Sequence, residues 1–159
     1  MGALKIRVLQ VGKPRRPYVI SGVDHFRRKI APHASLDFVP VREEPHRKGR
    51  TPQQIRRSEG GRMLDAMDRG HLWTALDPNG DPVDSEGLAS RMQAWLNRGR
   101  SRLGFAIGGP HGLPSTVTSG SDCCLSLSPM TFSHELTVLV VLEQIYRSLA
   151  IMNGLPYPK

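Results

Sequence analysis

Residues 123–152 read CCLSLSPMTFSHELTVLVVLEQIYRSLAIM, and no other stretch says as much about the architecture of this chain. They predict a short strand at 123–128, a turn that begins at Pro129, and a long helix from about His134 to Met152. Asn153-Gly154 follows the helix and is typical of a helix end. A strand that is followed closely by a helix is the unit from which α/β folds are built.

The same unit recurs along the rest of the chain. Apolar residues at period two or in short runs predict four further strands, near residues 4–8, 36–41, 71–76 and 103–107. Helices are expected at 18–30, from Thr51 to about Arg69, from Ser85 through Leu96, and briefly after Pro114, with Thr51 and Ser85 as caps. This alternation favours a mostly parallel sheet inside a three-layer α/β/α sandwich, with residues 1–159 forming one domain.

The last helix is apolar on more than one side. One face of a sheet cannot bury so broad a surface, and a second copy of the chain is the simplest partner for the rest, so a homodimer is expected. The apolar positions concerned are Leu136, Leu139, Val140, Leu142, Ile145, Tyr146, Leu149 and Met152.

Basic residues are concentrated in the first part of the chain. The chain carries 22 Lys and Arg against 14 Asp and Glu, a net charge of +8. Residues 1–62 hold 15 basic and 5 acidic side chains, whereas residues 63–159 hold 7 and 9. Most of the basic side chains are Arg, whose planar guanidinium suits phosphate. The charge indicates either a solvated surface or a footprint for nucleic acid, and both interpretations stay open on charge alone.

Other protein classes are not expected. The longest apolar run, Val138 to Leu142, ends at Glu143, whereas a membrane-spanning helix needs roughly 20 residues. Cys123 and Cys124 are adjacent, which is poor geometry for a disulfide, and no Cys or His group has the spacing of a zinc site, so no metal is expected. No secretory or lipidation signal is visible, and a reducing, cytoplasmic location is expected.

Small and apolar residues fill three loops that follow strands, at 76–80, 107–112 and 125–132. Open α/β sheets bind ligands at the carboxyl ends of their strands, so these loops are expected to form a site. The set suits a flat, moderately apolar ligand such as an adenosyl group. Gly108-Gly109-x-x-Gly112 departs from the pattern of dinucleotide sites, and the chain has no Gly-Lys-Ser or Gly-Lys-Thr for a nucleoside triphosphate.

Each of these features also has a plainer interpretation. Glycines after a strand commonly permit a tight turn, and Asp77-Pro78-Asn79-Gly80 is itself a strong turn signal. Met130 and Phe132 are equally suited to core packing. A flavodoxin-like protein that binds a small molecule is therefore an alternative, although the phosphate-loop signature is missing.

Three motifs, in their order along the chain, resemble those of the RlmH-type SPOUT methyltransferases. They are Leu76-Asp77-x-x-Gly80, Ile107-Gly108-Gly109-Pro110-x-Gly112 and Ser126-Leu-Ser-Pro-Met-Thr-Phe-Ser-His-Glu-Leu136. Ile6-Arg-Val-Leu-x-Val-Gly-Lys13 and Glu59-Gly60 resemble the same family. The resemblance covers essentially the whole chain.

The resemblance implies a C-terminal trefoil knot and a homodimer. It also implies transfer of the methyl group of S-adenosylmethionine, without a metal, to N3 of a pseudouridine in helix 69 of large-subunit ribosomal RNA in 70S-type ribosomes. By motif match, the residues expected to contact the cofactor are Leu76, Gly108, Leu127, Ser128, Pro129, Met130, Thr131 and Phe132.

Methylation at N3 requires that the imide proton be removed or its anion stabilised. His134 and Arg147 are candidates for this step, and each also has a plainer role. His134 could make a structural hydrogen bond, and Arg147 could pair with Glu143. Relatives usually end in Tyr-His and a basic residue, whereas Pro158 stands here in the place of that His, so a catalytically weakened RNA-binding homologue is an alternative function. Because the expected substrate is ribosomal RNA, the expected compartment is the cytoplasm or an organelle with bacterial-type ribosomes. The candidate catalytic residues are His134, Arg147, Tyr157 and Lys159.

Overall fold

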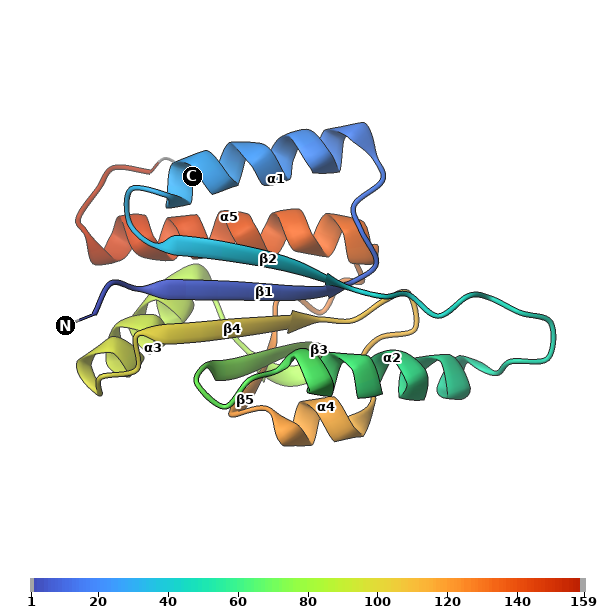
Figure 1. Ribbon diagram of the computed structural model, residues 1–159. Helices are drawn as coiled ribbons and strands as arrows, with labels where there is room; N and C mark the ends of the chain where they lie inside the picture. The colour runs from blue at the N-terminus through green and yellow to red at the C-terminus, as the bar shows by residue number, and fades with distance from the viewer. Residues whose placement is uncertain (1, 158–159) are drawn as a thin grey trace.

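The structure is a computed structural model and describes residues 2–157. Strands and helices alternate along the chain, as predicted (Figure 1). The strands are β1 (Lys5–Val11), β2 (Ser35–Val41), β3 (Leu72–Pro82), β4 (Arg102–Ile107) and β5 (Cys123–Ser126). The helices are α1 (Pro17–Ile30), α2 (Pro52–Ala66), α3 (Ser85–Asn97), α4 (Ser115–Gly120) and α5 (His134–Met152).

The strands form one parallel sheet in the order β2-β1-β4-β3-β5. Helix α5 packs against α1 and α3 on one face, while α2 and α4 pack together on the other (Figure 1). The predicted three-layer α/β/α sandwich is therefore confirmed. No helix between residues 2 and 157 combines the length and the apolar character that crossing a bilayer requires.

Strand β1 is buried on both of its faces, as is usual inside a parallel sheet. Ile6 and Val8 belong to the larger core, which α1, α3 and α5 cover. Leu9 and Val11 belong to a second core beneath α2 and α4. Since burying one aliphatic side chain contributes about 1.5–3 kcal/mol, this strand stabilises both helical layers at once.

The last helix does not lie beside the strand that precedes it. Strand β5 is at the edge of the sheet, yet α5 begins against the inner strand β1, where Nε2 of the fully buried Gln10 donates to the His134 carbonyl at 3.2 Å. The Glu135 carboxylate accepts the backbone N–H groups of Arg15 and Arg16, both at 3.0 Å. Residues 127–133 therefore cross the carboxyl ends of β3 and β4. The expected trefoil knot stays a prediction.

Helix α2 begins as predicted but ends early. Thr51 caps it with a reciprocal capping box, in which Gln54 also takes part. The helix ends at Ala66 and not near Arg69, because the chain turns at Asp68, whose carboxylate accepts the backbone N–H of the residues that lead into β3.

The cap of α3 was predicted one residue too late. The Asp84 carboxylate accepts the Gly87 N–H at 2.7 Å and is the true N-cap. The Ser85 hydroxyl instead donates to Gln144 of α5 at 2.6 Å, so this residue joins two helices. Both side chains suit a cap, and the tertiary contact decides between them.

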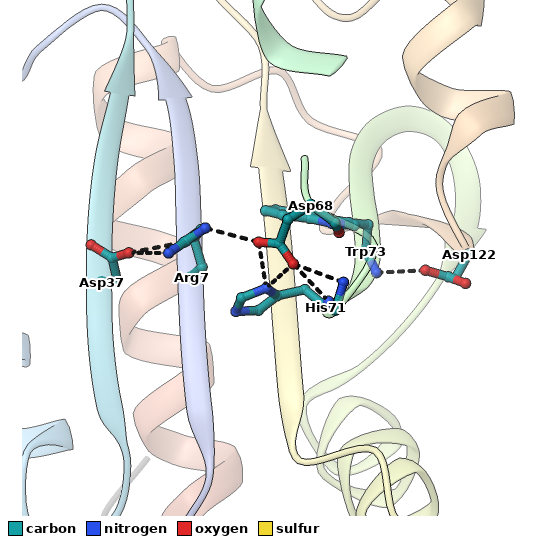
Figure 2. A network of polar contacts seen from close by, with 7 residues as sticks. Arg7, Asp37, Asp68, His71, Trp73 and Asp122 are labelled. Atoms are coloured by element: carbon teal, nitrogen blue, oxygen red, sulfur yellow. Dashed lines mark hydrogen bonds and ion pairs between the residues drawn. The ribbon is translucent and has the colours of Figure 1, made fainter. Parts of the chain in front are cut away.

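A polar network joins β1, β2 and the start of β3 (Figure 2). The Arg7 guanidinium contacts the carboxylates of Asp37 and Asp68, each at 2.8 Å. Nδ1 of the buried His71 also lies 2.8 Å from Asp68. Partial burial alone would raise the pKa of Asp68, but hydrogen bonds from His71 and from the Gly70 N–H, together with the Arg7 charge, hold that pKa below its ordinary value.

We predict that Asp68→Asn lowers the free energy of unfolding by about 1–2 kcal/mol at pH 7, since hydrogen bonds to a charged group contribute about that much where the group is partly exposed. Because the folded-state pKa of Asp68 is lowered, its stabilising effect is present above the ordinary pKa of an Asp and is lost as the pH falls through the folded-state pKa.

The variant should therefore lose less stability on acidification than the original chain, as measured by urea unfolding at a series of pH values. Asp65→Asn, which removes an exposed carboxylate from α2, is the control. If the Asp68→Asn variant and the original chain lost stability equally on acidification, the stabilising role of the Asp68 carboxylate would be contradicted.

Candidate functional site

Three loops lie on neighbouring strands at the carboxyl edge of the sheet. They are residues 77–80 within β3, 108–114 after β4 and 127–133 after β5. These are the loops in which the sequence predicted a ligand site, and the sheet order brings them to one edge. Parallel α/β sheets bind their ligands at this edge.

The loop within β3 is a wide bulge. Leu76 and Asp81 both pair with Leu125 of β5, so the residues between them leave the ladder. The Asp77 carboxylate accepts the Asn79 N–H at 2.8 Å. The predicted turn is confirmed, whereas the predicted end of the strand at residue 76 is wrong, because β3 resumes its pairing after the bulge.

The glycine loop after β4 closes on itself. The Gly112 N–H donates to the Gly109 carbonyl at 2.9 Å, and Gly112 has φ +79°. A Cβ on Gly108 would stand 2.7 Å from the Gly112 carbonyl carbon. Glycine is thus required at both ends of the loop, and the tight-turn interpretation holds whatever the loop binds.

The loop after β5 exposes an apolar side chain. The Ser128 hydroxyl accepts the Met130 N–H at 2.9 Å, and Ser133 caps α5 through the Leu136 N–H. The Met130 side chain is 74% exposed and Phe132 is half-buried. Core packing is therefore the wrong interpretation for Met130. Exposed apolar groups at a loop cluster indicate contact with a ligand or another chain.

Behind these loops lies a small apolar cavity. Leu76 and Leu127 line it together with Phe105 and Ile145. This cavity measures only about 10 Å³ and is a gap in the core packing, so a flat ligand would bind on the outer surface of the loops, against their backbone groups and the exposed Met130. The loop from Leu127 to Phe132 has no ionisable side chain, whereas the other two loops contain Asp77 and His111.

The predicted catalytic residues do not lie close together within a single chain. His134 is the first residue of α5, directly after the loop at 127–133. Arg147 is about 20 Å further along the helix axis, since each residue rises by about 1.5 Å. Tyr157 packs beside Arg147, and Lys159, like Pro158, lies outside the described residues.

Arg147 and Tyr157 form a cluster of their own at the far end of α5. The Arg147 guanidinium donates to Glu143 at 2.6 Å and lies 4.4 Å from the centre of the Tyr157 ring. Tyr146 meets the same ring edge to face at 4.9 Å. Burial and the neighbouring Glu143 carboxylate raise the pKa of Tyr157. The predicted pairing of Arg147 with Glu143 is confirmed, and the phenol stays protonated at neutral pH.

Comparison with known proteins assigns the architecture to a family. A family model described as "Predicted SPOUT methyltransferase" matches residues 4–158. The chain belongs to the SPOUT methyltransferase family. A "Ribosomal RNA large subunit methyltransferase H" of Halothermothrix orenii is 35% identical over 98% of this chain and 100% of its own length. The protein of that name in Acetivibrio thermocellus is 33% identical over 97% of this chain and 99% of its own.

A solved structure agrees with this assignment at the level of the fold. The tRNA (m1G37) methyltransferase from Aquifex aeolicus matches 99% of this chain and 75% of that chain, with a TM-score of 0.57 and 17% identity. The family assignment and the observed α/β fold therefore agree.

The basic part of this SPOUT chain, for which the sequence left a solvated surface and a nucleic-acid footprint open, includes a projecting loop. Residues 42–51 form a long loop that projects beyond the carboxyl ends of the strands (Figure 1). Glu59 of α2 is 2% exposed, and its Oε1 accepts the Glu44 N–H at 3.0 Å. Glu44 in turn pairs with Arg62 and, at 3.0 Å, with Arg50. These contacts fasten the basic loop to α2.

The two carboxylates of this anchor differ in their electrostatics. The hydrogen bond from Arg62, with the charge of Arg50, holds the pKa of Glu44 below its ordinary value. Burial raises the pKa of Glu59, whose Oε2 has no hydrogen-bond partner among the described residues and faces Gly109. Glu59 thus connects the basic loop to the glycine loop at an electrostatic cost.

We predict opposite effects for two substitutions of Glu59. Glu59→Ala leaves the buried Glu44 N–H without an acceptor and should cost about 1–3 kcal/mol of stability. Glu59→Gln keeps an acceptor and removes a charge whose burial is unfavourable. A carboxyl whose folded-state pKa is raised loses stabilising effect as the pH rises above its ordinary pKa, so Glu59→Gln should gain stability relative to the original chain between about pH 5 and pH 8. Urea unfolding at both pH values measures the free energy of unfolding of each variant. Equal destabilisation by Glu59→Gln and Glu59→Ala would contradict the predicted opposite effects.

Proposed function

We propose that this protein transfers a methyl group from S-adenosylmethionine to large-subunit ribosomal RNA, at N3 of a pseudouridine in helix 69. The RNA class is supported by the name shared by relatives that align with nearly the whole chain. The position and the helix are supported by the motifs of the sequence, chiefly residues 126–136.

The observation that carries the proposal is the arrangement of the loops on β3, β4 and β5. A Cβ on Gly80 would meet the backbone of Cys124 and Leu125 in β5 within 3 Å, and a Cβ on Gly108 would meet the Gly112 backbone of its own loop, so the first loop packs closely on β5 and the second is tightly folded. Leu76, Leu127 and the exposed Met130 offer apolar surface for the adenosyl group. These residues fit the donor, and with them we assign to the cofactor site Ser128, Pro129, Thr131 and Phe132.

The donor supplies an electrophilic methyl group when it is bound. The loops need only orient it toward the acceptor nitrogen and exclude water, which is where catalysis of such a transfer gains most. No metal enters this proposal. Removal of the N3 proton or stabilisation of its anion falls to His134, Arg147, Tyr157 and Lys159 as candidate catalytic residues.

A homodimer would bring these groups together. Leu136 is 36% exposed and Ile151 is 44% exposed on α5, and Leu139, Val140 and Tyr146 are half-buried between them. If two α5 helices pack antiparallel about a two-fold axis, the Arg147 end of one helix lies near the His134 end of the other. The partner subunit would then complete the site that one chain leaves divided.

Two alternatives remain distinguishable from this proposal. A weakened homologue that binds RNA but methylates it slowly is suggested by Pro158, which lies outside the described residues. A flavodoxin-like binder would take flavin or a dinucleotide. Calorimetric titration distinguishes the flavodoxin-like binder from the methyltransferase. Binding of S-adenosylhomocysteine supports the methyltransferase, and binding of flavin supports the flavodoxin-like protein.

The activity should appear when large ribosomal subunits that lack the modification are incubated with the protein and labelled S-adenosylmethionine. Gly108→Ala should weaken S-adenosylhomocysteine binding by about tenfold or more, equivalent to about 1.4 kcal/mol, because the added Cβ displaces the glycine loop. Gly61→Ala, whose Cβ would meet nothing within 4 Å, is the matched control. Absence of label in the RNA would overturn the proposed activity.

The dimer is tested with a pair of equally exposed leucines. Leu136→Glu should convert the protein to monomers in sedimentation experiments and abolish methylation, because a carboxylate would be buried in the apolar contact. Leu64→Glu on α2, also 36% exposed, should leave the dimer intact. Monomers in the original chain, or dimers in both variants, would contradict this arrangement.

A further inference from the structure

A hollow of about 820 Å³ lies at the carboxyl edge of the sheet, next to the cofactor loops but separate from them. It opens between the loop that joins β1 to α1 and the loop that follows β2. Its size falls within the roughly 300–1,000 Å³ of sites that take small molecules. Its lining includes Lys13, Pro14, Arg15, Arg42, Glu43 and His46.

The acidic groups at this hollow are neutralised by the protein itself. Glu43 pairs with Arg15 at 3.0 Å, and Glu44 is held by Arg62 and Arg50 of the anchor described above. Lys13 and Arg42, by contrast, are exposed and have no acidic partner within residues 2–157. The hollow therefore presents two positive charges outside any ion pair, of which Arg42 also acts on the Glu44 carboxylate, and such charges suit a phosphate.

The floor of the hollow is held in place before anything binds. Glu135 accepts the N–H groups of Arg15 and Arg16, which fixes the loop after β1 to the start of α5. These hydrogen bonds outweigh the partial burial that would raise the pKa of Glu135, and hold that pKa below its ordinary value. A preformed site loses less conformational entropy on binding.

One wall connects the hollow with the glycine loop. The exposed His46 ring stands edge to face against His111, with ring centres 5.3 Å apart. His111 belongs to the loop that we assign to the methyl donor. A base that stacks on His46 would therefore lie beside that loop, and His is among the residues on which unpaired RNA bases stack.

We propose that this hollow binds a phosphate-bearing nucleotide of the substrate RNA, adjacent in the strand to the nucleotide that is methylated. Lys13 and Arg42 contact its phosphate, and His46 contacts its base. The inference rests on the proposed function for the identity of the RNA. A strand of RNA fits better than a free nucleotide, because the loop from Arg42 continues into the exposed Arg47, Lys48 and Arg50, which extend the positive surface away from the hollow.

The test compares two double variants that remove the same charge. Lys13→Gln with Arg42→Gln removes the two cations of the hollow that form no ion pair within residues 2–157, whereas Arg98→Gln with Arg100→Gln removes two exposed cations at the opposite edge of the sheet, before β4. Binding to large ribosomal subunits is measured across a series of salt concentrations, and S-adenosylhomocysteine binding is measured by calorimetry.

The hollow variant should bind subunits about tenfold more weakly, with a slope of log K against log salt that is shallower by about 0.7–0.9, since one phosphate contact is lost. Its S-adenosylhomocysteine affinity and thermal unfolding should match those of the original chain. An affinity and slope equal to those of the Arg98 and Arg100 variant would overturn the proposal.

A second measurement locates the contact. Hexauridylate RNA added to labelled protein should shift the amide resonances of residues 12–16 and 40–46, and uridine without phosphate should not. Shifts confined to residues 108–114 would also overturn the proposal. Because neither measurement requires methyl transfer, failure of the methylation assay and failure of this inference are told apart.

Discussion

The crossing of residues 127–133 is the constraint on which the site depends. It takes the chain from the edge strand β5 across the ends of β3 and β4 to the inner strand β1. The Gln10 amide and the Glu135 carboxylate hold its far end, the first through the His134 carbonyl and the second through two N–H groups of the loop after β1. The loop that exposes Met130 is thus fixed between β5 and α5, and it passes the ends of β3 and β4, whose loops share the same edge because the strands are parallel.

Glu135, together with Glu59 of α2, lies between two regions of different character. The cofactor loops are apolar and nearly free of charge, while the loops after β1 and β2 are basic. Glu135 connects the first set to the loop after β1, and Glu59 connects the glycine loop to the loop after β2. Two acidic residues therefore position the basic surface relative to the cofactor loops. The net charge of +8 is not spread evenly, and its placement is determined by a few carboxylates.

Much of the fold could be predicted from patterns in the sequence, because apolar periodicity and turn residues are local signals. Thr51 was identified as a cap for that reason. The errors arose where a distant contact decided the outcome. The sequence predicts Ser85 as a cap, but its hydroxyl donates to Gln144 of α5, about sixty residues away. Strand β3 resumes after its bulge because β5 pairs with the residues on both sides of the bulge.

The site divides in the same way. Its three loops were found because each follows a strand, and the sheet order brought them together. Arg147 and Tyr157 were expected near the cofactor loops, yet their distance follows from the length of α5, which no motif reveals. Gln10 was overlooked, although an amide between Leu9 and Val11 of a buried strand is a visible signal for a tertiary hydrogen bond.

The contact between β1 and α5 also has a consequence for how the chain is made. Strand β1 is synthesised before α5, and their hydrogen bond joins residues 124 positions apart. Until α5 leaves the ribosome, Val8 and its neighbours on that face lack the part of their cover that α5 supplies. The sheet cannot complete its larger core during synthesis, and contacts of such high sequence separation make folding slow. The newly made chain must therefore remain soluble while its larger core lacks the α5 residues, and its excess of positive charge helps to keep it so.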